Sequence, residues 1–229
     1  MKPSTRTGLL SFTVASVLAV TSTPLWAQDD DFIDEIVTTG TRKEGTSPLE
    51  ALSPVDVLTG EALVNQASFD ITDSLTRIAP SLNTQRFPIA DGTAFIRPVT
   101  LRNLAPDHTL VLVDGSRRHR SPLVNLQISP LGTVNTGSQA VDFSAIPAAA
   151  IKRVEILRDG ASAQYGSDAI AGVVNVILKD ANEGISLSAQ TGEYSEGDGS
   201  RTTIGANAGF ALGEDGFINV TAERSMSDT

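Results

Sequence analysis

The chain has 229 residues, of which 40% are hydrophobic and 19% charged, so it can bury a core and is not expected to be disordered. Cysteine is absent, which excludes disulfides, thiolate metal sites and a cysteine nucleophile. The two histidines, His108 and His119, leave little material for zinc chemistry or a Ser-His-Asp triad. A formal charge of -10 repels phosphate backbones, so nucleic acid is not an expected partner.

Residues 1–27 have the organisation of a secretory signal peptide. Lys2 and Arg6 precede an uncharged stretch, Gly8–Val20, and Ala27 closes the segment just before an acidic run. A membrane anchor would need about 20 consecutive apolar residues, and serine and threonine interrupt this stretch. We therefore expect an exported protein, whose mature chain keeps 15 basic and 27 acidic residues.

Residues 28–47 are predicted to form an acidic, extended tether. The strip Ile36–Thr39 is rich in β-branched residues, which favour an extended backbone. Nothing nearby offers it a second strand before Pro48, so it is an unpaired strand edge that a partner can extend by strand addition. The alternatives are a frayed terminus and the first strand of the following domain.

Residues 48–180 alternate short strands and short helices, which is typical of a small α+β domain. Thr59 and Asp70 are candidate helix N-caps, Pro80 ends the second helix, and Asp114–Gly115 is a hairpin-type turn. The predicted strands cover residues 54–58, 99–102, 109–113, 150–157 and 173–178, and the predicted helices cover 60–66, 71–78 and 161–165.

Two stretches of this domain, Arg86–Pro98 and Ser121–Phe143, are rich in Pro, Gly, Asn, Ser and Thr. Structureless loops longer than about 12–15 residues in a compact domain are usually functional or disordered. These loops are therefore the first candidates for ligand contact, with Arg86, Phe87 and Arg97 as the candidate residues in the first of them.

Residues 181–229 change to a period of two. Ile185, Leu187 and Ala189 alternate with polar residues, and two further segments repeat the pattern after the turns at 195–200 and 213–216. Such segments are typical of outer-membrane β-barrel strands, although a soluble meander shows the same alternation. A bacterial barrel needs at least 8 strands and this stretch supplies about three, so either the chain is a fragment or these strands belong to a soluble sheet.

Several motifs, met in order along the chain, resemble the plug region of TonB-dependent outer-membrane receptors. Residues 150–179 (AIKRVEILRDGASAQYGSDAIAGVVNVILK) resemble the family's most recognisable plug signature. Leu101–Leu104 is similar to its I-R-G-L motif, with Asn103 in place of glycine, and residues 109–118 are similar to its strand-turn-strand segment. Residues 35–42 look like the segment that carries the TonB box.

The resemblance implies the plug region of a gated transporter in the outer membrane. In this family a 22-stranded barrel encloses an amino-terminal plug, and the usual substrates are ferric siderophores, cobalamin or other scarce nutrients. The inner-membrane protein TonB pairs with the box by strand addition and pulls on it. The implied partners are thus TonB, the chain's own barrel and a nutrient chelate, with no cofactor, resident metal or catalytic residue; the implied TonB box is Glu35, Ile36, Val37, Thr38 and Thr39.

By resemblance, Arg102, Glu155 and Arg158 are candidates to lock the plug to the barrel wall. Around Glu155, charged and apolar residues alternate, which places one face of the strand on the core and the other toward the wall. The alternative is a solvated strand face. In a receptor, Arg117 and Arg118 would be candidates to meet an anionic ligand such as a siderophore carboxylate.

Three classes of function stay open. The first is the plug region of an outer-membrane nutrient receptor, and the second is a free-standing periplasmic binding or interaction module with the plug fold. The third, a secreted hydrolase, is weak because neither Ser162 nor Ser167 lies in a G-x-S-x-G elbow and no histidine follows His119. Continuation of the reading frame into further strands of period two would separate the first two classes.

Overall fold

The structure, a computed structural model, describes residues 39–40, 53–66, 68–84, 95–124, 137–193, 195, 199–213 and 216–227. All described residues belong to one compact unit, residues 34–229. The predicted signal peptide and most of the predicted tether lie outside the described residues. Across the described ranges, no helix is both long enough and apolar enough to span a membrane.

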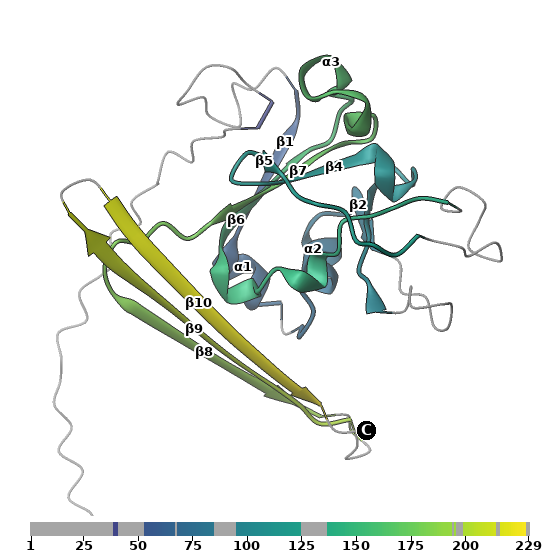
Figure 1. The fold of residues 1–229 in the computed structure, drawn as a ribbon. Coiled ribbons are helices and arrows are strands. Elements are labelled where there is room, and N and C mark those ends of the chain that lie inside the picture. Colours follow the sequence, from purple (N-terminus) through teal and green to yellow (C-terminus); the bar gives the residue numbers. More distant parts are fainter. Residues whose placement is uncertain are drawn as a thin grey trace, which may run out of the picture. The chain divides into compact units, whose positions relative to one another are not determined.

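The centre of the domain is a mixed sheet (Figure 1). Strand β6 pairs antiparallel with β1 and β7, whereas β4 pairs parallel with β7 and antiparallel with β5. Within the described residues the sheet has five strands in the order β1-β6-β7-β4-β5: β1 (Val55–Thr59), β6 (Ile151–Leu157), β7 (Gly172–Leu178), β4 (Thr109–Val113) and β5 (Ser116–Arg117).

Two short helices follow β1, and side-chain caps fix where each begins. The Thr59 hydroxyl accepts from Ala62 N at the start of α1 (Gly60–Val64). Asp70 Oδ1 accepts from the backbone N–H of Thr72 at 2.9 Å at the start of α2 (Ile71–Ile78). A cap of this kind stabilises a helix by about 1 kcal/mol. Helix α2 ends before Ala79 because the following proline disfavours a helical backbone there.

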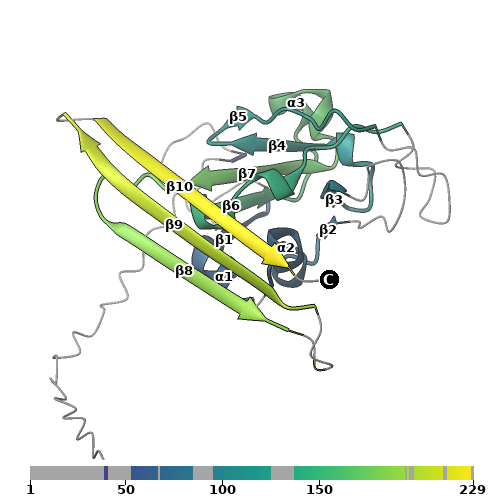
Figure 2. The ribbon, with the colours of Figure 1, turned by 60° about the horizontal axis from the view of Figure 1, so that its bottom comes forward.

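Both faces of the central sheet are buried. Helices α1 and α2 lie on one side of it, and the short helix α3 (Ser162–Tyr165) lies on the other (Figures 1 and 2). The first face packs into a large core that includes Leu63, Leu75, Phe143, Val154 and Val174. The second face packs into a smaller cluster of Val55, Leu110, Leu112, Leu157, Ala161, Ala169 and Val173.

Two tight turns carry residues of positive φ. Asp114 (φ 47°) and Gly115 (φ 74°) join β4 to β5, which confirms the predicted hairpin turn, because a two-residue hairpin of this type needs positive φ at both positions. Arg102 (φ 53°) and Asn103 (φ 58°) form the second turn, after β3 (Val99–Leu101). Asparagine tolerates positive φ better than most residues, so Asn103 can stand where the related motif has glycine.

The last described strands form a separate antiparallel sheet in the order β10-β9-β8. One of its faces is polar and partly covered, and Asn207 on that face is buried. The other face is apolar and exposed, with Leu187 at 78% and Phe210 at 54% exposure. The strands are β8 (Ile185–Gly192), β9 (Arg201–Leu212) and β10 (Gly216–Ser227).

The predicted fold class is therefore confirmed as a mixed sheet with short helices followed by antiparallel strands. Helix α2 and strand β4 have the predicted bounds, and the other predicted elements differ by a few residues at their ends. The short strand β2 (Leu82–Thr84), which pairs with β3, was not predicted, because three residues are too few to show a period.

Candidate functional site

The last residue of the expected TonB box, Thr39, is attached to the central sheet, and the next residue, Gly40, is attached to α3. Thr39 is only 1% exposed, and its backbone N–H and hydroxyl both donate to Glu155 Oε2, at 2.9 and 2.5 Å. The Thr39 hydroxyl also accepts from Asn175 Nδ2 at 3.1 Å. Gly40 N donates to the Tyr165 hydroxyl at 3.0 Å. We call this set of contacts, made by Thr39 and Gly40 with Glu155, Asn175 and Tyr165, the Thr39 clasp.

One expectation from the sequence is corrected here. Of the predicted tether, residues 28–47, the structure describes only Thr39 and Gly40, which are bonded to the domain; residues 35–38 of the predicted box lie outside the described residues. Glu155 does not face a barrel wall, since it is completely buried. Glu155 is buried although it lies on the face opposite to the main core, because that second face of the sheet is covered as well.

The buried Glu155 carboxylate is balanced by a neighbouring cation. Arg153, two residues earlier on the same face of β6, donates from Nε to Glu155 Oε1 at 2.9 Å. Asn175 stands directly opposite Glu155 in the β6–β7 register, which brings both side chains to the same face. Charged groups are almost never fully buried without such a partner, so Arg153 and Glu155 act as one unit.

Helix α3 links the clasp to the edge of the sheet. Arg117 on β5 makes an ion pair of 2.5 Å with Asp168 and also donates to the backbone carbonyl of Tyr165. Arg120 reaches the other oxygen of the same carboxylate at 3.2 Å. The guanidinium of Arg117 is thus engaged in holding the segment that carries Tyr165.

The other two predicted lock residues are held within the domain. Arg102 donates to the carbonyls of Ile170 and Ala171 at 2.8 and 3.2 Å. Arg158 pairs with Asp56 at 3.0 Å. Both arginine side chains keep 44% of their surface exposed, so a role at a barrel wall stays a prediction for these two.

Different residues join the domain to strands β8–β10. Glu223 Oε2 accepts from Ala149 N at 3.3 Å, beside the 3₁₀ turn η5 (Ala148–Ala150). Asn219 Nδ2 donates at 3.2 Å to the carbonyl of Ala181, which lies in the connection from β7 of the domain to β8. Glu223 and Asn219 both lie on the polar face of the strands. The domain therefore covers the polar face and leaves the apolar face exposed.

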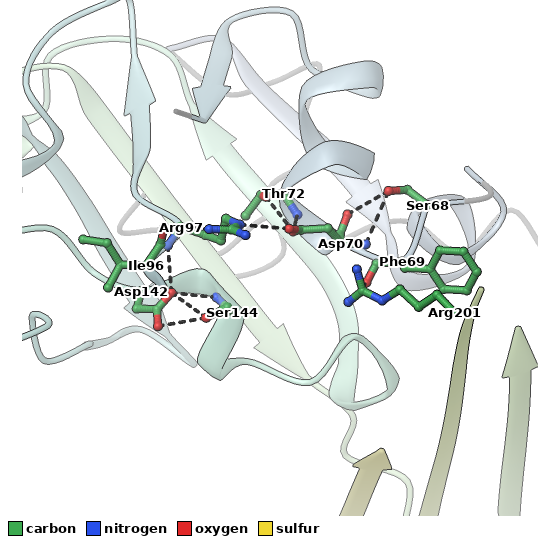
Figure 3. A network of polar contacts seen from close by, with 9 residues as sticks. All are labelled: Ser68, Phe69, Asp70, Thr72, Ile96, Arg97, Asp142, Ser144 and Arg201. Carbon is green, nitrogen blue, oxygen red and sulfur yellow. Dashed lines mark hydrogen bonds and ion pairs between the residues drawn. The ribbon is translucent and has the colours of Figure 1, made fainter. Parts of the chain in front are cut away.

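Figure 3 shows a third connection, which runs from the loop segment at Arg97 to strand β9. Asp142 Oδ1 accepts from Arg97 N at 3.0 Å, and Arg97 Nε pairs with Asp70 Oδ2 at 3.1 Å. Next to Asp70, the Arg201 guanidinium lies 5.4 Å from the centre of the Phe69 ring and donates to the Phe69 carbonyl at 3.4 Å. Arg97, predicted as a ligand contact, therefore has a structural partner at the N-terminus of α2.

Of the other predicted ligand residues, Arg86 and Phe87 lie outside the described residues. Arg117 and Arg118 line a cavity of about 240 Å³ together with Asp107, Gln139 and Asp168. Arg118 makes no ion pair with any described residue, whereas Arg117 is paired with Asp168. The cavity therefore offers one guanidinium whose charge is not matched by a described carboxylate.

Just after β7, Asp180 and Lys152 form an exposed ion pair with N–O distances of 2.9 Å to both carboxylate oxygens. The hydrogen bond from Lys152 holds the pKa of Asp180 below its usual value. A carboxyl group whose pKa is lowered by folding contributes stability above its unfolded pKa and loses it as the pH falls through the folded pKa. Because both side chains are exposed, this contribution is small.

Sequence comparison now assigns the family. Residues 47–173, which are more than half of the chain, match the TonB-dependent Receptor Plug Domain family. The matched region runs from just before β1 to the start of β7, so it includes Glu155 and Tyr165 of the clasp but ends before Asn175 and begins after Gly40. The chain belongs to the family of TonB-dependent receptor plug domains.

Solved structures of the same kind match the fold. The siderophore receptor PirA from Acinetobacter baumannii is 29% identical with a TM-score of 0.56, and the match covers 75% of this chain and 24% of that one. A mutant of the ferric enterobactin receptor PfeA from Pseudomonas aeruginosa, in complex with enterobactin, is 23% identical with a TM-score of 0.56, covering 77% and 25%. The unliganded ferric citrate transporter FecA is 15% identical with a TM-score of 0.55, covering 79% and 26%. The chain thus spans about a quarter of the length of these proteins.

Proposed function

We propose that this chain forms the plug and first wall strands of an outer-membrane receptor that takes up a ferric siderophore or a similar scarce chelate. The observation that carries the proposal is the two-sided sheet β8–β10, whose polar face receives the plug domain while its apolar face is left exposed. An apolar outer face suits lipid and a polar inner face suits a lumen. The similar structures are those of a siderophore receptor, a ferric enterobactin receptor and a ferric citrate transporter, which supports an iron chelate as substrate.

This arrangement also favours the receptor over a free-standing periplasmic module. Large side chains on the outer face, among them Ile185, Leu187 and Ile204, stay about half to three quarters exposed. In water, a patch of this kind is an aggregation liability, whereas in hydrocarbon it is the expected surface. Residues 1–27 serve in this proposal as the cleaved signal peptide that takes the chain out of the cytoplasm.

The experiment that tests the proposal is uptake of candidate ferric chelates by cells whose only source of the activity is the complete receptor. Growth under iron limitation and accumulation of radioactive iron should both depend on the receptor and on TonB. Equal iron uptake with and without the receptor, for every chelate that the purified receptor binds, would contradict the proposal.

Energy coupling is expected to be lost when Val37 is replaced by proline. In the proposal, TonB adds a strand to residues 35–39, and proline lacks the backbone N–H that such a strand donates. Uptake should fall to the level of a strain without TonB, while chelate binding and the amount of receptor in the outer membrane stay unchanged. Val37→Ile, which keeps the β-branched side chain and the N–H, is the matched control. Wild-type uptake by Val37→Pro would place the box elsewhere.

Reversing the charge of Arg118 is expected to weaken binding of an anionic chelate by about tenfold or more, because hydrogen bonds to charged groups contribute about 1.5–3 kcal/mol. Arg118 is the better test than Arg117, whose replacement would also release Asp168. Lys179→Glu makes the same change of charge outside the cavity and should leave affinity unchanged. Equilibrium binding to the complete receptor measures the effect, and equal affinity of Arg118→Glu and wild type would remove this cavity from the binding site.

A further inference from the structure

Two Asp-Gly pairs lie wholly within the described residues, Asp114–Gly115 and Asp159–Gly160. In such a pair the backbone nitrogen of the glycine can attack the carboxyl carbon of the aspartate before it, because glycine has no Cβ to shield that nitrogen. All four residues are exposed, so access to water does not distinguish the two pairs. Their hydrogen bonds, however, differ.

The Asp114–Gly115 pair is bonded to strand β7 on all its reacting groups. Gly115 N donates to Asn175 Oδ1 at 3.1 Å, so the nitrogen that would attack is already engaged. The Asp114 carboxylate accepts from Leu178 N at 2.9 Å, which fixes the group that would be attacked. Asp114 N also donates to the carbonyl of Val176 at 2.9 Å. Attack of the nitrogen on the carboxyl group would need the first two of these bonds to break.

The Asp159–Gly160 pair is held in the opposite way. Gly160 N donates to Oδ1 of Asp159 itself at 2.7 Å, which places the nitrogen beside the carboxyl group that it would attack. The Asp159 side chain is 62% exposed, and its ion pair with Arg102 is 3.9 Å long. Residues 158–160 connect β6 to α3 and belong to neither element. Such proximity of the two reacting groups favours an intramolecular reaction.

We propose that Asp159 is a site of spontaneous aspartate isomerisation and that Asp114, in an identical dipeptide, is protected from it. Gly160 N forms a bond to Cγ of the protonated Asp159 carboxyl group. The N–H proton and the carboxyl hydroxyl leave as water, which gives a cyclic succinimide. Water then adds to either carbonyl of this imide. Addition at the side-chain carbonyl restores aspartate, and addition at the main-chain carbonyl gives isoaspartate, in which the main chain runs through Cγ.

The folded domain can hold the product. Leu157 and Ala161, on either side of the exposed connection, are 2% and 9% exposed and belong to the same apolar cluster. Isoaspartate lengthens the main chain between these two anchors, and the exposed residues 158–160 take up the added length without disturbing the cluster. Isoaspartate should therefore accumulate in receptor that stays folded. The inference is independent of the proposed function, since the reaction needs only the folded chain and water.

Peptide mapping of the complete receptor, incubated at physiological pH and temperature in heavy-oxygen water, tests the proposal. Electron-transfer fragmentation locates isoaspartate, and the heavy oxygen marks every aspartate that has passed through a succinimide. Succinimide turnover at Asp159 should exceed that at Asp114 by about thirtyfold or more, the factor that corresponds to one charge-assisted and one neutral hydrogen bond. The difference should largely vanish in the chain unfolded in urea, where neither pair keeps its hydrogen bonds.

Asp159→Glu is the variant that isolates the site, because glutamate keeps the charge at this exposed position but closes a larger imide ring far more slowly. It should remove most of the isoaspartate that an isoaspartate-specific methyltransferase detects in the folded receptor. Asp180→Glu is the matched control, since the Asp180 side chain is 58% exposed and alanine follows it in the sequence. This second variant should leave the amount of isoaspartate unchanged.

The contrary results are distinct from one another. Absence of isoaspartate at Asp159 in the folded receptor would overturn the proposal, whether or not the chain unfolded in urea forms it. Equal turnover at Asp114 and Asp159 in the folded receptor would overturn the protection by β7. Neither result would bear on the proposed function, because the measurements do not involve transport.

Discussion

Replacing Gly172 with alanine is expected to lower the free energy of opening of the central sheet by about 3–5 kcal/mol, the combined cost of a forbidden backbone angle and overpacking. Gly172 begins β7 with φ 140°, a conformation that L-residues rarely adopt. A Cβ at this position would lie 2.3 Å from the Leu157 carbonyl oxygen and 2.7 Å from Leu101 Cδ1. The first of these atoms belongs to the backbone of β6, so the strand pair cannot relax without losing its register.

Gly115→Ala provides the matched comparison for Gly172. Gly115 also has positive φ, but a Cβ there would meet no atom within 4 Å, so the cost reduces to the backbone term of about 1–2 kcal/mol. Native-state hydrogen exchange of peptides that cover β6 and β7 in the complete receptor reports the opening free energy directly. Equal protection of the two variants would show that crowding at Leu157 does not matter.

Glu155→Ala is expected to destabilise the same strands by about 3–5 kcal/mol, because removing one member of a buried ion pair leaves the other charged and without its partner. Here the residue left behind is Arg153, whose side chain is 15% exposed, and Thr39 loses both of its bonds to the carboxylate. The same exchange experiment measures this change.

Arg158→Ala is the control for Glu155, since both lie in the same sequence motif and both were predicted to lock the plug to the wall. The ion pair of Arg158 with Asp56 is partly exposed, at 44% and 32% of the two side chains, so its loss should cost no more than about 1 kcal/mol. If Glu155→Ala were as mild as Arg158→Ala, the burial of the carboxylate in the folded protein would be in doubt.

Most of the fold could be predicted because its signals are local. A capping aspartate before α2, a proline after it and an Asp-Gly pair after β4 each act within a few residues, and each element lies where these residues place it. The alternating pattern of β8–β10 likewise predicted which side chains share a face. The order of strands in the central sheet was not predicted, since it depends on pairings between segments far apart in the chain.

The clasp could not be predicted for the same reason. In the sequence, Glu155 does not differ from the other charged residues of β6. It is buried because α3 and Thr39 cover the second face of the sheet. One signal was present, namely Asn175, a single polar residue inside the apolar run GVVNVIL. Buried polar groups need hydrogen-bond partners, so a polar residue in such an apolar run indicates that a donor or acceptor from elsewhere in the chain contacts it.

Strand β1 is the first strand that the structure describes along the chain, and it also lies at an edge of the sheet. Among the described residues it pairs with β6 on one side and with no strand on the other. Tension that enters through residues before Thr39 is carried first by the Thr39 clasp, which bonds that segment to β6. Only after the clasp opens does it reach β1 at Val55, which can then separate from β6 without shearing a central strand. The pairings of β6 with β7 and of β7 with β4 do not involve β1 and would persist. The two edges of the sheet differ, because within the described residues β1 is held by five residue pairs and β5 by two, so the edge at which the chain enters is the more firmly paired one.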